Sequence, residues 1–263
     1  MTAMTAADFE ARYRSQPDPW GYQTSEYERA KYAATLRACG PGLFDGALEL
    51  GGSIGVFSAL LAPRCHSLVT IDAAPTAVTA ARRRLAGSPA AEIILGSIPE
   101  AIPRRRYDLV VASEILYYLD RDRLAATLDA LRRLTAAGAR VVAVHWRAPG
   151  PERPLHAAEV HCALREQPWL APVARADTDR YLLDVLERLW APDVAIDCIR
   201  RRLLGLAARS ESSLAQTSRA RVVRLPDATR GNRRCFGIDS SHMRRQSRPA
   251  TRRLPPLAKS GTL

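Results

Sequence analysis

A short glycine loop is the part of this chain best suited to chemistry. The loop, Gly51–Gly55, reads G-G-S-I-G and follows an apolar segment expected to be a strand, Ala47–Leu50. Glycines at such a turn let the backbone bend sharply and approach a ligand closely. The next apolar segment ends in Asp72, a carboxylate placed to accept hydrogen bonds from the two hydroxyls of a ribose. This order predicts a site for a nucleoside-containing cofactor at the carboxyl edge of a parallel sheet.

The carboxylate of Glu49, just before the loop, narrows the class of cofactor. A sulfonium and an ammonium group are stabilised by a nearby carboxylate, whereas a pyrophosphate is repelled by one. Glu49 therefore favours S-adenosyl-L-methionine (SAM) over a dinucleotide. Each carboxylate also has an ordinary structural alternative: Glu49 can brace the loop, and Asp72 can cap the helix that starts near Pro75.

The glycine loop matches two other patterns less well. Its letters fit the G-x-S-x-G nucleophile elbow of α/β-hydrolases, with Ser53 as the nucleophile. Too few residues precede Gly51 for the strands and the oxyanion loop that such an enzyme needs. The loop also lacks the full G-x-G-x-x-G of a NAD-binding protein. A hydrolase, a NAD-type protein and a purely structural turn remain the alternatives.

Strands and helices alternate along the chain, which predicts an α/β fold with a doubly wound, Rossmann-like, mostly parallel sheet. A capping box of Ser25 and Glu28 is expected to begin one helix. Asp120 is expected to cap another, Arg121–Ala136, which Gly138 ends. The expected strands are Ala47–Leu50, Leu68–Ile71, Glu92–Leu95, Tyr107–Ala112 and Val141–Val144, with Pro172–Arg175 and Tyr181–Leu186 closing the sheet.

The positive charge of the chain is concentrated at its C-terminal end. The 263 residues carry 39 Lys and Arg against 27 Asp and Glu, a net charge of +12. Counted along the sequence, residues 1–190 hold 23 basic and 22 acidic residues, and residues 191–263 hold 16 and 5. We therefore expect one α/β domain over 1–190 and an Arg-rich, disordered tail over 191–263.

Several functional classes find no support in the sequence. The tail has neither zinc-ligand spacing nor interleaved aromatic residues, so no specific nucleic-acid partner is expected. No run of residues is apolar and long enough to insert into a membrane, and the N-terminus lacks a signal core, so a cytoplasmic location is expected. Five scattered cysteines and unclustered histidines predict neither a disulfide framework nor a metal site. The oligomeric state is left open.

Together these motifs resemble the class I SAM-dependent methyltransferases, and among them the nodulation protein S group, which N-methylates a deacetylated chitooligosaccharide. The similarity spans about residues 7–189. Two positions depart from the usual pattern: Ser53 replaces the middle loop glycine, and Ser97 stands where an acid often reads the adenine amine. The segments that carry the similarity are Asp18–Tyr22 with Thr24–Glu28, Glu49–Gly55, Tyr107–Val110, Ser113–Leu119 and Val144–Arg147.

The resemblance implies SAM as cofactor and a small-molecule or oligosaccharide as methyl acceptor. Glu114 is expected to orient the acceptor amine and take its proton, with His145 as a second catalytic candidate. Tyr117, Tyr118 and Trp146 are expected to line the acceptor groove. The expected cofactor contacts are Glu49, Gly51, Ser53, Gly55, Asp72, Ser97, Ile98, Ser113 and Trp20.

Each of these acceptor-side residues has an ordinary alternative. Glu114 can simply begin a helix, one tyrosine of the Tyr117–Tyr118 pair can belong to the core, and His145 can be a buried residue at a strand end. The function has alternatives too: methyl transfer to oxygen or to another small amine, or a SAM-fold binding protein with a basic tail that catalyses nothing.

Overall fold

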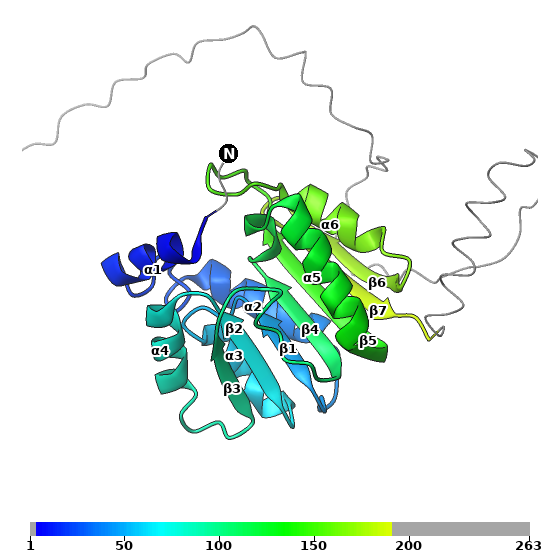
Figure 1. Cartoon of the computed structure of the whole chain (residues 1–263), viewed down its shortest axis with the longest axis horizontal. Coiled ribbons are helices and arrows are strands. Elements are labelled where there is room, and N and C mark those ends of the chain that lie inside the picture. Colours follow the sequence, from blue (N-terminus) through cyan, green and yellow to red (C-terminus); the bar gives the residue numbers. More distant parts are fainter. Residues whose placement is uncertain (1–3, 191–263) are drawn as a thin grey trace, which may run out of the picture. The chain divides into compact units, whose positions relative to one another are not determined.

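The computed structural model describes residues 4–190, in which seven strands form one sheet in the order β3-β2-β1-β4-β5-β7-β6 (Figure 1). The expected tail, 191–263, lies outside the described residues. Strands β1 to β5 pair in parallel, and β7 joins β5 and β6 antiparallel, which confirms the doubly wound, mostly parallel sheet. The strands are β1 (Ala47–Leu50), β2 (Leu68–Asp72), β3 (Ala91–Leu95), β4 (Tyr107–Ser113), β5 (Thr135–Trp146), β6 (Leu170–Asp177) and β7 (Tyr181–Arg188).

Helices cover both faces of the sheet, because successive side chains of a strand point to opposite faces. Leu48 and Val110 belong to the apolar core under α5 and α6, whereas Ala47 and Val111 belong to the core under α2 and α3. None of the helices within residues 4–190 has the length and apolar character needed to cross a bilayer. The helices are α1 (Ala6–Ser15), α2 (Glu26–Ala38), α3 (Val56–Leu61), α4 (Pro75–Arg84), α5 (Arg121–Leu134) and α6 (Ala157–Arg165), with 3₁₀ turns η1 (Ala62–Arg64) and η2 (Leu116–Tyr118).

The structure confirms the predicted N-cap residues of α2 and α5. The Ser25 side chain accepts a hydrogen bond from the Glu28 amide at 3.3 Å, and Asp120 accepts one from the Arg123 amide at 2.8 Å. The capping box of α2 is nevertheless incomplete. The Glu28 carboxylate accepts from Lys31 Nζ at 3.0 Å rather than turning back to Ser25.

The expected end of the fifth helix was wrong. Helix α5 stops at Leu134, and β5 begins at Thr135, so Gly138 lies inside a strand. The pairing of β4 with β5 shifts register between Tyr107 and Leu109, and Gly138 has φ +75° in the extra residues of this bulge. A positive φ is inexpensive only for glycine, so the residue serves the bulge rather than a helix end.

Strand β1 lies between β2 and β4, so the order of strands along the chain reverses at this point. In open α/β sheets a crevice forms at such a reversal, beyond the carboxyl ends of the strands. The carboxyl ends that meet here belong to Leu50, Asp72 and Ser113. The fold therefore brings the glycine loop, Asp72 and the segment after β4 to one edge.

Candidate functional site

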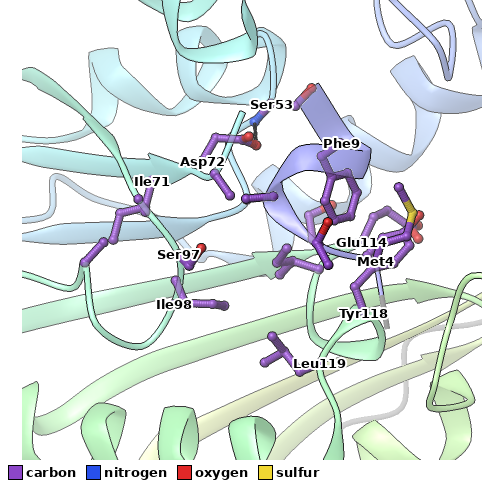
Figure 2. Close-up of a pocket in the computed structure, with 18 of the residues that line it drawn as sticks. Met4, Phe9, Ser53, Ile71, Asp72, Ser97, Ile98, Glu114, Tyr118 and Leu119 are labelled. Carbon is purple, nitrogen blue, oxygen red and sulfur yellow. Dashed lines mark hydrogen bonds between the residues drawn. The ribbon is translucent and has the colours of Figure 1, made fainter. Parts of the chain in front are cut away.

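A cavity of about 780 Å³ opens at this edge of the sheet, within the range usual for small-molecule sites (Figure 2). Its wall comes from the glycine loop, the end of β2, the segment after β3, the turn after β4 and helix α1. Among the residues expected from the sequence, the wall includes Gly51, Ser53, Asp72, Ser97, Ile98, Ser113, Trp20, Glu114 and Tyr118.

The glycine loop can fold only because two of its positions lack a side chain. A Cβ on Gly51 would lie 2.9 Å from the Ile115 side chain, and one on Gly52 would collide with Thr70. Ser53 takes a left-handed conformation with φ 52°, which is uncommon for a residue other than glycine. Its amide donates to Asp72 Oδ2 at 2.8 Å, and this bond holds the unusual conformation.

Asp72 braces two neighbouring segments and also faces the cavity. Its carboxylate accepts from the Ser53 amide at 2.8 Å and from the Ala74 amide at 2.9 Å, so it braces the loop and the start of α4. It also lines the cavity (Figure 2). Burial raises the pKa of Asp72, against the lowering effect of these backbone donors. Each carboxylate oxygen has a second lone pair, so the group can still accept bonds from a ligand.

Glu49 and Gly55 lie behind the loop rather than in the cavity wall. The Glu49 side chain is 2 % exposed and accepts from Ser58 Oγ at 2.5 Å. Burial raises the pKa of Glu49 to about 7. The contacts of Glu49 are those of the alternative role, bracing the loop against α3, and Gly55 is the N-cap of that helix with φ +77°.

Glu114 is the most heavily hydrogen-bonded group in the wall. Its carboxylate accepts from Lys31 Nζ at 2.7 Å, from the Trp146 amide at 3.0 Å and from the Tyr117 hydroxyl. Its backbone is left-handed, with φ 56°, directly after β4. Such strain in a residue other than glycine is concentrated at functional sites, where surrounding contacts hold it. Here the three donors fix an anionic oxygen at the cavity.

Sequence reasoning missed Lys31, which is 2 % exposed in α2. Its ammonium is 2.7 Å from Glu114 and 3.0 Å from Glu28, so one buried cation serves two carboxylates. Lysines on helices are nearly always exposed unless paired, so the sequence around Lys31 predicts an exposed side chain. The spacing of Glu28 and Lys31, three residues apart on one helix face, was the available signal.

Sequence reasoning also missed helix α1, which supplies Phe9 and Tyr13 to the wall, with Met4 just before it. The Tyr13 hydroxyl and Ser53 Oγ share a hydrogen bond of 2.5 Å, and the Phe9 ring lies edge-on to Tyr118 with centroids 5.0 Å apart. The helix therefore joins both sides of the site (Figure 2). A capping box of Thr5 with Asp8 was its local signal.

Besides Glu49 and Gly55, three residues expected on the acceptor side do not line the cavity. The His145 ring is fully buried, and its Nε2 accepts from the Leu116 amide at 3.2 Å. Burial holds the pKa of His145 well below its usual value, so it stays neutral. Trp146 packs edge-on against Tyr27, with ring centroids 5.1 Å apart, and Tyr117 is a core residue whose hydroxyl bonds Glu114. The catalytic role expected of His145 finds no support in this position, because the ring bonds the Leu116 amide and does not line the cavity.

The described part of the chain holds no cluster of potential metal ligands. Within residues 4–190, no group of three or more His, Cys, Asp or Glu side chains has an arrangement that could hold a metal ion.

Comparison with known proteins places the chain among nodulation proteins. Residues 5–149 match the family model "Nodulation protein S (NodS)". A nodulation protein S of Rhizobium tropici is 32 % identical over 127 residues, which cover 48 % of this chain and 53 % of that protein. One from Bradyrhizobium diazoefficiens is 35 % identical over 103 residues, covering 39 % and 49 %. The chain therefore spans about half the length of the curated relatives it matches.

Solved structures share the fold over most of their length. A putative methyltransferase from Pseudomonas syringae is 34 % identical with a TM-score of 0.56, covering 62 % of this chain and 100 % of that one. The N-methyltransferase NodS of Bradyrhizobium japonicum WM9, in complex with S-adenosyl-L-homocysteine (SAH), has a TM-score of 0.63 at 24 % identity. That match covers 70 % of this chain and 99 % of the other, and it establishes a common fold.

Proposed function

Since this chain belongs to the nodulation protein S family, we propose that it transfers a methyl group from SAM to a free amine of a deacetylated chitooligosaccharide or a similar aminosugar. A structural relative is described as an N-methyltransferase in complex with SAH, which supports both the cofactor and the transfer to nitrogen. The observation that carries the proposal is a single cavity whose wall holds Asp72 at the end of β2 and Glu114 after β4.

The residues of the cavity fit SAM. The Gly51 backbone forms part of the cavity wall, and the Asp72 carboxylate beside it can accept from the ribose hydroxyls. Ile71 and Ile98 offer an apolar surface to the adenine, beside the hydroxyl of Ser97. When bound, SAM supplies a methyl carbon activated by a positive sulfur. The protein then has to align an acceptor with that carbon and exclude water, and alignment alone is worth several kcal/mol.

Glu114 is the group proposed to receive the acceptor amine. A carboxylate offers about four lone-pair positions, and Lys31, Trp146 and Tyr117 take three of them. Oε1 accepts only from Lys31, so it keeps one position for an N–H of the acceptor. An amine must be unprotonated to attack, and an adjacent carboxylate can orient it and accept its proton. An acetylated nitrogen has a delocalised lone pair and should not react.

Glu114→Gln tests this assignment. We expect turnover of a deacetylated chitooligosaccharide to fall about 10²- to 10⁴-fold, the range for a lost acid–base group, while the Kd for SAH changes little. The fully acetylated oligomer is the matched control substrate, and mass spectrometry with fragmentation should place the added methyl on nitrogen. Methyl groups found on oxygen, or turnover confined to an unrelated amine, would support the alternative acceptors. SAH binding without turnover of any acceptor would support a binding protein.

A further inference from the structure

A buried chain of hydrogen bonds runs behind the cavity, from β7 to the turn after β4. Asp184 Oδ2 is 2.9 Å from His161 Nδ1, and His161 Nε2 is 3.1 Å from His145 Nδ1. The chain ends where the Leu116 amide donates to His145 Nε2 at 3.2 Å. The two rings are fully buried, and Asp184 is 2 % exposed. Neither the cavity nor the proposed chemistry uses these groups.

The two ends of this chain decide which ring nitrogens carry protons. An amide can only donate, so His145 Nε2 must accept, and the proton of the neutral ring lies on Nδ1. That proton points to His161 Nε2, which leaves the His161 proton on Nδ1, facing Asp184. Asp184 also accepts from Arg165 at 2.5 Å, so the carboxylate stays ionised and acts as the final acceptor. Every bond therefore runs in one direction, from Leu116 to Asp184.

This series of hydrogen bonds cannot carry a proton away from the methyl acceptor, because its end nearest the cavity is a backbone amide, which does not titrate. It can hold that amide in place. Leu116 begins η2, and Tyr118 and Leu119 of the same segment line the cavity, while Tyr117 donates to Glu114. Without His145, the buried Leu116 amide would lose the acceptor of its hydrogen bond, and such groups are costly to leave unpaired.

We propose that Asp184, acting through His161 and His145, fixes the segment Ser113–Leu119 against the sheet and thereby positions Glu114 at the cavity. The three are positioning residues, since none of them touches the cavity. Their effect on turnover rests on the function proposed above, but the geometry they impose does not. Glu114, with its left-handed backbone, lies two residues before the Leu116 amide. Because His145 holds that amide, the backbone at Glu114 is hindered from returning to a more favourable conformation.

The first test uses the full unmutated chain, labelled with ¹⁵N in histidine. Long-range ¹H–¹⁵N spectra should show His145 and His161 as neutral rings that both carry their proton on Nδ1. A proton on Nε2 of either ring would overturn the proposal, because the chain could not then reach Leu116. This measurement needs no methyl acceptor, so it stands apart from the proposed function.

The second test compares three variants of α6. His161→Leu removes the acceptor for His145, whereas His161→Gln retains an acceptor at that position. Leu164→Ala removes a fully buried side chain of the same helix that takes no part in these hydrogen bonds. We expect hydrogen exchange at the Leu116 amide to accelerate at least tenfold in His161→Leu, with recovery in His161→Gln and no such change in Leu164→Ala. Equal exchange in His161→Leu and the unmutated chain, or equal acceleration in Leu164→Ala, would refute the proposal.

Discussion

Asp72→Asn separates the bracing role of this carboxylate from the cofactor-binding role proposed for it. The substitution keeps the shape of the side chain and one acceptor oxygen, but it removes the charge and the second acceptor. Asp108 provides a matched control, because its carboxylate accepts from the Asp45 amide at 2.9 Å and the Gly46 amide at 3.0 Å, as Asp72 accepts from Ser53 and Ala74. Asp108 does not line the cavity.

The expected loss of affinity follows from the hydrogen bonds involved. A bond to a charged group contributes about 1.5–3 kcal/mol and a neutral one about 0.5–1.5 kcal/mol, so loss of charge costs about 1 kcal/mol per bond. Two ribose hydroxyls give about 2 kcal/mol, which is about a 30-fold rise in Kd. The orphaned backbone amide costs folding stability of about 1–3 kcal/mol in either variant.

Isothermal titration with SAH and thermal unfolding of both variants measure these quantities. We expect Asp72→Asn and Asp108→Asn to lower Tm to a similar extent, while only Asp72→Asn weakens SAH binding. If both variants bind SAH as the unmutated chain does, Asp72 braces the loop and takes no part in binding. If both weaken it equally, the loss reports general destabilisation and the argument from the ribose is wrong.

Two further predictions concern Glu49 and the end of the chain. Burial raises the pKa of Glu49 from 4.5 to about 7, so its contribution to stability is full below pH 4.5 and is lost as pH rises through about 7, a change of about 3 kcal/mol. Urea unfolding of Glu49→Gln and of the unmutated chain at pH 5 and pH 8 measures this effect. The unfolding free energy of Glu49→Gln, relative to that of the unmutated chain, should be higher at pH 8 than at pH 5; the same difference at both pH values would contradict this. A chain ended after Trp190 should bind SAH as the full chain does, because all residues of the cavity wall precede Leu124; calorimetry at matched salt would reveal a loss that moves the domain boundary.

The strands, the caps and the cofactor edge were predictable because the physics behind them is local. Apolar residues in Ala47–Leu50 and Tyr107–Ser113 select buried strands whatever follows them. Gly51 needs a positive φ, and Asp72 ends the strand next to it, so both reach the edge where parallel strands finish. Even the failed prediction at Gly138 identified a glycine that the backbone requires, although in a bulge instead of a helix end.

Contacts between distant parts of the chain decided which side chains form the site. Lys31 and Glu114 are 83 residues apart, and Tyr13 and Ser53 are 40 apart, so no local pattern records their pairing. Glu49 and His145 were expected at the site but are buried away from it. Each lies near the carboxyl end of its strand, and its side chain bonds Ser58 or the Leu116 amide inside the protein. The sequence alone thus determined the backbone scaffold and its cofactor edge, through propensities that act over a few residues. Only tertiary packing decided which charged and aromatic side chains face the cavity, because direction and burial depend on what the rest of the fold places against them.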